Sequence, residues 1–156
     1  MLTSVLLSAG LLALLLVCSA FFSGSESALF SLDGYALEQL DEEKRPADRA
    51  IRALLRKPRK LLATLLLGNE FINITISTVG LGVLITLQRG GYDWVQPWMN
   101  IVVITPLLLI FGEIAPKAIA VRAGLGWARI VAVPLRMFEI VIYPFRELLG
   151  LIATLL

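Results

Sequence analysis

The sequence has 156 residues, of which 58% are hydrophobic and 17% are charged. A soluble domain is typically about half apolar and about a quarter charged, so this composition indicates a membrane protein and argues against a soluble enzyme. The 14 basic and 12 acidic residues leave a net charge of +2, too low for a nucleic-acid-binding domain. One cysteine and no histidine exclude an intrachain disulfide and histidine-based catalysis. Any bound metal would therefore need oxygen ligands.

Three apolar segments predict the membrane topology. Residues 2–22 contain no charged side chain, and at about 1.5 Å per residue this run can cross a hydrocarbon core of about 30 Å. Residues 61–87 form a second tract, interrupted by one Asn-Glu pair, and residues 94–112 form a third. We therefore predict an all-α membrane protein with three transmembrane helices, at about 2–27, 61–87 and 94–117.

A cleavable signal peptide is the alternative interpretation of residues 1–24, because Leu15-Leu-Val-Cys18 resembles a lipoprotein cleavage site. However, no basic residue precedes the apolar run, and the run is longer than a signal peptide requires. We therefore favour a membrane span, with Cys18 as a thiol packed on its helix.

The basic residues predict the orientation. The connection 31–60 carries eight lysines and arginines, the connection between spans two and three carries only Arg89, and the tail after span three carries five. Because basic residues accumulate on the cytoplasmic side, we expect the first connection and the C-terminus to be cytoplasmic and the N-terminus to be outside. This is the topology of a multi-pass protein of the inner (plasma) membrane.

The two polar regions show helical patterning. The pattern of the connection 31–60 predicts two short amphipathic helices on either side of Pro46. We interpret them as a cytoplasmic helical hairpin whose basic face contacts anionic lipid headgroups. Arg122, Arg129 and Arg136 repeat every seven residues, as in a juxtamembrane amphipathic helix over about 120–156. Its apolar C-terminal end suggests a longer protein that continues in the cytoplasm.

Polar residues at membrane depth are costly and often functional, and the first such cluster is Ser23-Gly-Ser-Glu-Ser27 at the inner end of span one. Ser23 and Ser27 share a helical face. Gly24 weakens the helix and is a candidate break. The alternative is a helix cap, in which Ser25 or Glu26 satisfies free backbone amides.

The second cluster is Gly68-Asn69-Glu70 with Asn73 in span two. Asn69 and Asn73 are four residues apart and also share a face. An ion ligand and an interhelical hydrogen bond are both plausible roles for Asn69, whereas for Asn73 the hydrogen bond is favoured.

The third cluster is Gly112-Glu113-Ile-Ala-Pro116-Lys117 at the end of span three. Pro116 has no amide hydrogen, so the helical bond to the Gly112 carbonyl is lost and that carbonyl is free to bind a ligand. Glu113 adds a carboxylate beside it, as in the broken helices of transporters. The alternative is that Glu113 pairs with Lys117, four residues later.

Together these groups supply hydroxyl, amide, carbonyl and carboxylate oxygens, which suit a hard cation. Magnesium, sodium and a proton all fit this set of residue types. Magnesium would be expected to retain some of its water molecules.

In three ordered motifs the sequence resembles the transmembrane domain of the CorC and cyclin M (CNNM) proteins, a family implicated in magnesium transport. The motifs are Phe22-Ser-Gly-Ser-Glu-Ser-Ala-Leu-Phe30, Gly68-Asn69 with Asn73, and Phe111-Gly-Glu-Ile-Ala-Pro-Lys117. The resemblance covers essentially the whole chain, 1–156, as a single domain. Glu70 departs from it, because the family more often has a second asparagine there.

The resemblance implies a homodimer in which each protomer binds Mg²⁺ in an inward-facing cavity. It also implies cytoplasmic CBS and CorC domains, which this sequence lacks. The implied Mg²⁺ ligands are Ser23, Ser27, Asn69, Gly112 and Glu113. The implied neighbours, supporting these ligands or forming a site for a coupling ion, are Ser25, Glu26 and Asn73.

The resulting hypothesis is a non-enzymatic magnesium transporter that works by alternating access, with breaks at Gly24 and Pro116. The resemblance suggests efflux, with Na⁺ as a candidate exchanged ion. The alternative is a membrane anchor and dimerisation module that senses Mg²⁺ without transporting it. An intramembrane hydrolase using Ser25 or Ser27 is disfavoured, because there is no histidine to act as a base.

Overall fold

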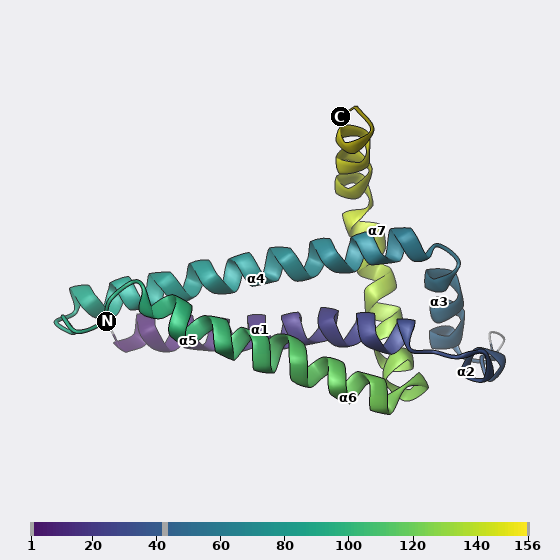
Figure 1. The fold of residues 1–156 in the computed structure, drawn as a ribbon, viewed down its shortest axis with the longest axis horizontal. Coiled ribbons are helices and arrows are strands. Elements are labelled where there is room, and N and C mark those ends of the chain that lie inside the picture. The colour runs from purple at the N-terminus through teal and green to yellow at the C-terminus, as the bar shows by residue number, and fades with distance from the viewer. Residues whose placement is uncertain (1, 42–43, 156) are drawn as a thin grey trace. The chain divides into compact units, whose positions relative to one another are not determined.

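The computed structural model describes residues 2–41 and 44–155, and the regular elements in these ranges are all helices (Figure 1). In chain order they are α1 (Leu2–Phe30), α2 (Gly34–Glu38), α3 (Pro46–Leu55), α4 (Pro58–Arg89), α5 (Met99–Leu107), the π-helix η1 (Leu108–Ile114), α6 (Ala115–Ala123) and α7 (Leu125–Leu155). Three stretches are long and apolar enough to span a membrane: Val5–Phe30, Pro58–Arg89 and Met99–Ala123. The predicted all-α class with three membrane helices is confirmed.

The chain forms two compact units. The first contains the chain up to Ser23 together with Gly68–Pro116, and the second contains Gly24–Leu67 together with the chain from Lys117 onward. The divisions therefore fall before Gly24, before Gly68 and after Pro116. Gly24 and Pro116 are the two positions at which the sequence predicts breaks, although α1 remains helical through Gly24.

In the first unit, small residues let α4 approach its neighbours closely. A Cβ atom on Gly68 would lie 2.5 Å from the Phe22 ring, and one on Gly80 would lie 2.7 Å from Asn100 Oδ1. The Asn100 side chain also donates a hydrogen bond of 3.1 Å to the Ser77 carbonyl. Such small-residue contacts are the usual means by which membrane helices pack, since lipid provides little hydrophobic drive for association.

The third span begins at Met99, five residues later than predicted. Residues 94–98, assigned to the span from their apolar character, instead form turns, with a hydrogen bond of 2.9 Å from the Met99 amide to the Gln96 carbonyl. Pro97 lies within these turns. The second span begins at Pro58 rather than at 61, because proline is well suited to the first turn of a helix.

A π-helix occupies residues 108–114, immediately before Pro116. At its end the Ala115 amide donates to the Ile110 carbonyl, five residues earlier, instead of the usual four. Pro116 cannot donate the ordinary bond to Gly112 because it has no N–H. The distortion expected at Pro116 thus takes the form of a wider helical segment, a feature often found at functional sites.

In the second unit, α3 packs on α7. The buried apolar side chains of α3 are Ala50, Ile51 and Leu54, and those of α7 are Ala128, Val131, Ala132 and Leu135. Buried Asp48 at the start of α3 accepts two hydrogen bonds from Arg129 of α7, of 2.7 Å from Nε and 3.0 Å from Nη2. This bidentate, charge-assisted pair links the two helices.

The juxtamembrane helix α7 begins at Leu125, not near residue 120. Gly124 adopts a positive φ of 49°, which favours glycine and separates α6 from α7. The three arginines at seven-residue spacing differ in their surroundings, since Arg122 and Arg136 are exposed whereas Arg129 is partly buried against Asp48.

Candidate ion-binding site

Polar side chains from three helices of the first unit meet within the apolar spans. Ser19 and Ser23 of α1 are buried, with 0% and 1% of their surface exposed. Asn69 and Asn73 lie one turn apart on α4, and Glu113 lies in η1. We refer to these five residues as the oxygen cluster.

The oxygen cluster is connected by hydrogen bonds that run across the helices. Ser19 Oγ lies 2.9 Å from Asn73 Oδ1 and 3.4 Å from Asn69 Oδ1, and can donate its one hydrogen to either. Asn73 Nδ2 donates to Glu113 Oε1 over 3.0 Å. Ser23 Oγ donates to the Glu113 backbone carbonyl over 3.3 Å. The Glu113 residue is therefore held through both its side chain and its backbone.

Gly112 lets η1 approach α1 closely beside the oxygen cluster. It is buried, and a Cβ atom added to it would lie 2.9 Å from Ser19 Oγ and 3.0 Å from a Leu108 methyl group. A larger residue would push the Ser19 hydroxyl out of its position. This packing requirement for glycine is independent of any role of the Gly112 carbonyl as an ion ligand, which stays a prediction.

The predicted site residues between Gly24 and Ser27 belong to the second unit. Ser25 is buried, and the Ser27 carbonyl accepts the Ser31 amide as part of the last turn of α1. Glu26 lies 3.2 Å from the Lys117 ammonium. Because α1 continues to Phe30, these residues lie inside a helix and not at a helix start, so the helix-cap alternative does not apply.

Gly24 also has a packing role in the second unit. A Cβ atom at this position would lie 3.1 Å from the Trp127 indole nitrogen. Gly24 thus allows the Trp127 ring to lie directly against α1. The structure therefore brings together Ser23, Asn69, Asn73, Gly112 and Glu113 in one unit, and it places Gly24, Ser25, Glu26 and Ser27 in the other.

The sequence interpretation missed Ser19. This residue lies inside the run taken as simply apolar, yet its hydroxyl lies within hydrogen-bonding distance of both Asn69 and Asn73. The available signal was the spacing of Ser19, Ser23 and Ser27, which recur every four residues and therefore follow one helical face. Glu70, which departs from the family pattern, is exposed and lies outside the oxygen cluster.

The oxygen cluster offers hydroxyl, amide and carboxylate oxygens, all of them hard ligands. Among the described residues, no group of three or more cysteine, aspartate or glutamate side chains is placed to hold a metal. Glu113 is thus the single carboxylate of the cluster. An ion bound at the cluster would therefore have one charged ligand, and affinity for hard divalent cations rises with the number of such ligands.

Comparison with known proteins agrees with this architecture. The cyclin M transmembrane N-terminal domain matches residues 10–156. The chain is 34% identical over 102 residues to the UPF0053 inner membrane protein YfjD of Escherichia coli, covering 65% of this chain and 23% of that protein. It is 36% identical over 110 residues to a UPF0053 protein of Haemophilus influenzae, covering 70% and 25%.

A third relative is matched over more of the chain. The UPF0053 protein YhdP of Bacillus subtilis is 31% identical over 163 residues, which cover 94% of this chain and 35% of that protein. The matched region therefore spans between about a quarter and a third of these relatives' lengths. With the family matched over nearly all of its residues, the chain belongs to the cyclin M transmembrane domain family.

Proposed function

We propose that this domain binds Mg²⁺ at the oxygen cluster and moves it across the membrane. The observation that carries the proposal is the hydrogen-bonded series Ser19, Asn73 and Glu113, which joins three helices of one unit inside otherwise apolar spans. A carboxylate and several neutral oxygens at membrane depth are expensive unless they serve a ligand or one another.

The hydrogen bonds of the cluster suit an ion that binds and leaves. Asn73 Nδ2 engages one oxygen of the Glu113 carboxylate, which leaves the other to face a cation or its bound water. Asn69 Oδ1 receives only a long contact from Ser19, so it can turn to an ion at little cost. Ser23 would complete the ligand set together with the Gly112 carbonyl.

Alternating access is the proposed mode of transport, with Mg²⁺ efflux in exchange for Na⁺. The support for this mode is that two divisions between the compact units fall at Gly24 and Pro116. Pro116 follows the π-helix η1, and Gly24 packs closely against the Trp127 ring. In this proposal the cytoplasmic side is that of the basic residues 44–60, and the active form is a homodimer regulated by further cytoplasmic CBS and CorC domains.

Titration of the purified protein with Mg²⁺ tests the site. Glu113→Gln removes the only carboxylate of the cluster and should weaken binding at least tenfold, by about 1.4 kcal/mol or more. Asn69→Ala should weaken binding less, because it removes a neutral ligand. Glu70→Gln is the matched control, since it makes the same carboxylate-to-amide change at an exposed position on α4, next to Asn69. Equal effects of Glu113→Gln and Glu70→Gln would reject the site.

Flux through proteoliposomes separates transport from sensing. A transporter should move Mg²⁺ across the bilayer, and Glu113→Gln should abolish this flux while leaving Glu70→Gln active. Normal Mg²⁺ binding without flux from the intact full-length protein would instead support the alternative, a membrane anchor and dimerisation module that senses the ion.

A further inference from the structure

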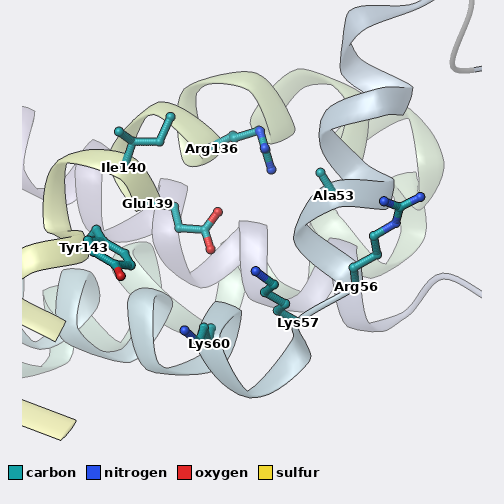
Figure 2. A pocket seen from close by; sticks show the side chains of 8 residues that line it. All are labelled: Ala53, Arg56, Lys57, Lys60, Arg136, Glu139, Ile140 and Tyr143. Atoms are coloured by element: carbon teal, nitrogen blue, oxygen red, sulfur yellow. The ribbon is translucent and has the colours of Figure 1, made fainter. Parts of the chain in front are cut away.

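A second site is indicated within the second unit, whereas the oxygen cluster belongs to the first. A cavity of about 480 Å³ lies between the end of α3, the first turn of α4 and the middle of α7 (Figure 2). Its polar lining consists of Arg56, Lys57, Lys60, Arg136, Glu139 and Tyr143. We refer to it as the basic pocket, and its volume is in the range of small-molecule sites in proteins.

The charge of the basic pocket selects the kind of ligand. The lining of the pocket contains four cationic side chains and one carboxylate, that of Glu139, so its net charge is positive. In Figure 2 the Lys57 ammonium and the Glu139 carboxylate point toward the same space, and the Arg136 guanidinium projects over it. Lysine and arginine converging on one cavity are suited to phosphate oxygens, which accept several charge-assisted hydrogen bonds.

The position of the basic pocket indicates the source of the phosphate. Lys57 directly precedes Pro58, the first residue of the second span, and Lys60 lies in its first turn. These cations therefore lie at the end of a membrane helix, where lipid headgroups are found. Basic pockets at this level are a recognised setting for anionic headgroups.

Apolar surface beside the basic pocket favours a lipid over a soluble phosphate. A second cavity of about 300 Å³ shares Ala53, Arg136 and Ile140 with the first and extends to Val133 and Met137. Met137 and Ile140 are 66% and 68% exposed. An acyl chain or glycerol backbone would cover these side chains and gain free energy, whereas inorganic phosphate would gain nothing from them.

We infer that the basic pocket binds the phosphate of an anionic membrane phospholipid, with the lipid's apolar part lying over Met137 and Ile140. The binding does not depend on ion transport. Glu139 reduces the affinity of the pocket for an anion, so that the lipid is held reversibly.

Native mass spectrometry of the purified protein in neutral detergent tests this inference. The probes are dihexanoyl phosphatidylglycerol, the zwitterionic dihexanoyl phosphatidylcholine, and glycerol 3-phosphate, which has the phosphate but no acyl chains. We expect phosphatidylglycerol to bind more tightly than both. Equal binding of phosphatidylcholine would overturn the charge argument, and equal binding of glycerol phosphate would overturn the lipid assignment.

Matched variants locate the binding. Lys57→Gln and Arg136→Gln should each weaken phosphatidylglycerol binding about tenfold, the effect of losing one charged hydrogen bond. Arg59→Gln is the control, because Arg59 belongs to the same basic run but does not line the pocket. A loss in Arg59→Gln equal to that in Lys57→Gln would indicate general surface attraction and refute the pocket.

Glu139→Gln provides a test that a folding defect cannot imitate. Removing the opposing carboxylate should raise the affinity for phosphatidylglycerol and leave that for phosphatidylcholine unchanged. A misfolded variant would lose affinity for both lipids. Weaker phosphatidylglycerol binding by a Glu139→Gln protein with an unchanged melting temperature would contradict the inference.

Discussion

Asn73 Nδ2 donates a hydrogen bond of 3.0 Å to Glu113 Oε1, joining α4 to η1. The same Asn73 side chain accepts from Ser19 of α1 over 2.9 Å, so that one amide links three helices. Ser19 is buried, and Asn73 and Glu113 are half-buried. Asn73 therefore has a structural role in addition to any contact with an ion or its hydration shell.

Replacing Asn73 by leucine should destabilise the first unit. The variant loses two interhelical hydrogen bonds, each worth about 0.6 to 2 kcal/mol in membrane helices, so we expect a total loss of about 1 to 4 kcal/mol. Unfolding of the detergent-solubilised protein with increasing SDS measures it. Thr78→Ala is the control, because the Thr78 hydroxyl donates to the Ile74 carbonyl of its own helix. A leucine variant as stable as this control would show that the amide links contribute little.

Substitution of Gly68 tests the close approach of α1 and α4. Gly68→Ala places a methyl group 2.5 Å from the Phe22 ring, which must then move. We expect a loss of about 1 to 3 kcal/mol, as for other overpacked sites. Gly82→Ala on the same helix is the control, since nothing lies within 4 Å of its Cβ position, and it should be neutral or slightly stabilising.

Relieving the overlap should restore stability in the Gly68→Ala protein. Adding Phe22→Leu removes the ring that the new methyl group meets, so the double variant should be more stable than the sum of the two single losses predicts. Strict additivity in the same SDS unfolding measurement would show that Gly68 and Phe22 are not in contact.

The elements that follow from local chemistry were predictable. Three spans follow from the length of the apolar runs, and the place of the distortion in span three follows from the missing N–H of Pro116. Its form, a π-helix, was not predictable, because a helix can respond to a proline by kinking or by widening. Glu113, Asn69 and Ser23 were candidates because polar groups at membrane depth are conspicuous, and their role as ion ligands stays a prediction.

Long-range pairs were not predictable in the same way. Asp48 and Arg129 are 81 residues apart, and each fits the polar face of its own amphipathic helix equally well. Only the packing of α3 on α7 shows that Arg129, unlike Arg122 and Arg136, turns toward a buried carboxylate. Ser19 was missed for a related reason: one small hydroxyl in an apolar run has no distinguishing feature until its partners on other helices are known.

The Asp48–Arg129 pair should make the stability of the second unit depend on pH. The hydrogen bond from Arg129 lowers the pKa of the Asp48 carboxyl below its ordinary value, although burial acts in the opposite direction. The unfolded chain, with an aspartate pKa of about 3.9, therefore takes up a proton more readily than the folded chain. The stabilisation is complete above the unfolded pKa and is lost as the pH falls through the lower, folded pKa.

Asp48→Asn tests this dependence. The variant should be destabilised at neutral pH by about 3 kcal/mol, since Arg129 loses its charged partner, and its melting temperature should fall less than that of the wild type between pH 5 and pH 3. Asp33→Asn is the control, because Asp33 caps α2 and asparagine caps a helix equally well. Parallel melting curves for wild type and Asp48→Asn across this range would contradict the assignment.

Glu26 and Lys117 form an ion pair of 3.2 Å whose side chains are 31% and 45% exposed. If Glu26 acts only through this pair, Glu26→Gln and Lys117→Gln should each cost less than about 1 kcal/mol, as expected for a partly exposed pair. The double variant should then be no less stable than either single variant, because the second change removes no further interaction.

If Glu26 instead binds a coupling cation, Glu26→Gln should change the dependence of Mg²⁺ flux on the Na⁺ concentration, whereas Lys117→Gln should not. Flux and melting temperature, measured on the same three proteins, distinguish the two roles. If Glu26 acts only through the ion pair, Glu26→Gln and Lys117→Gln should have the same effect in both measurements. If Glu26 binds a cation, only Glu26→Gln should change the Na⁺ dependence of the Mg²⁺ flux.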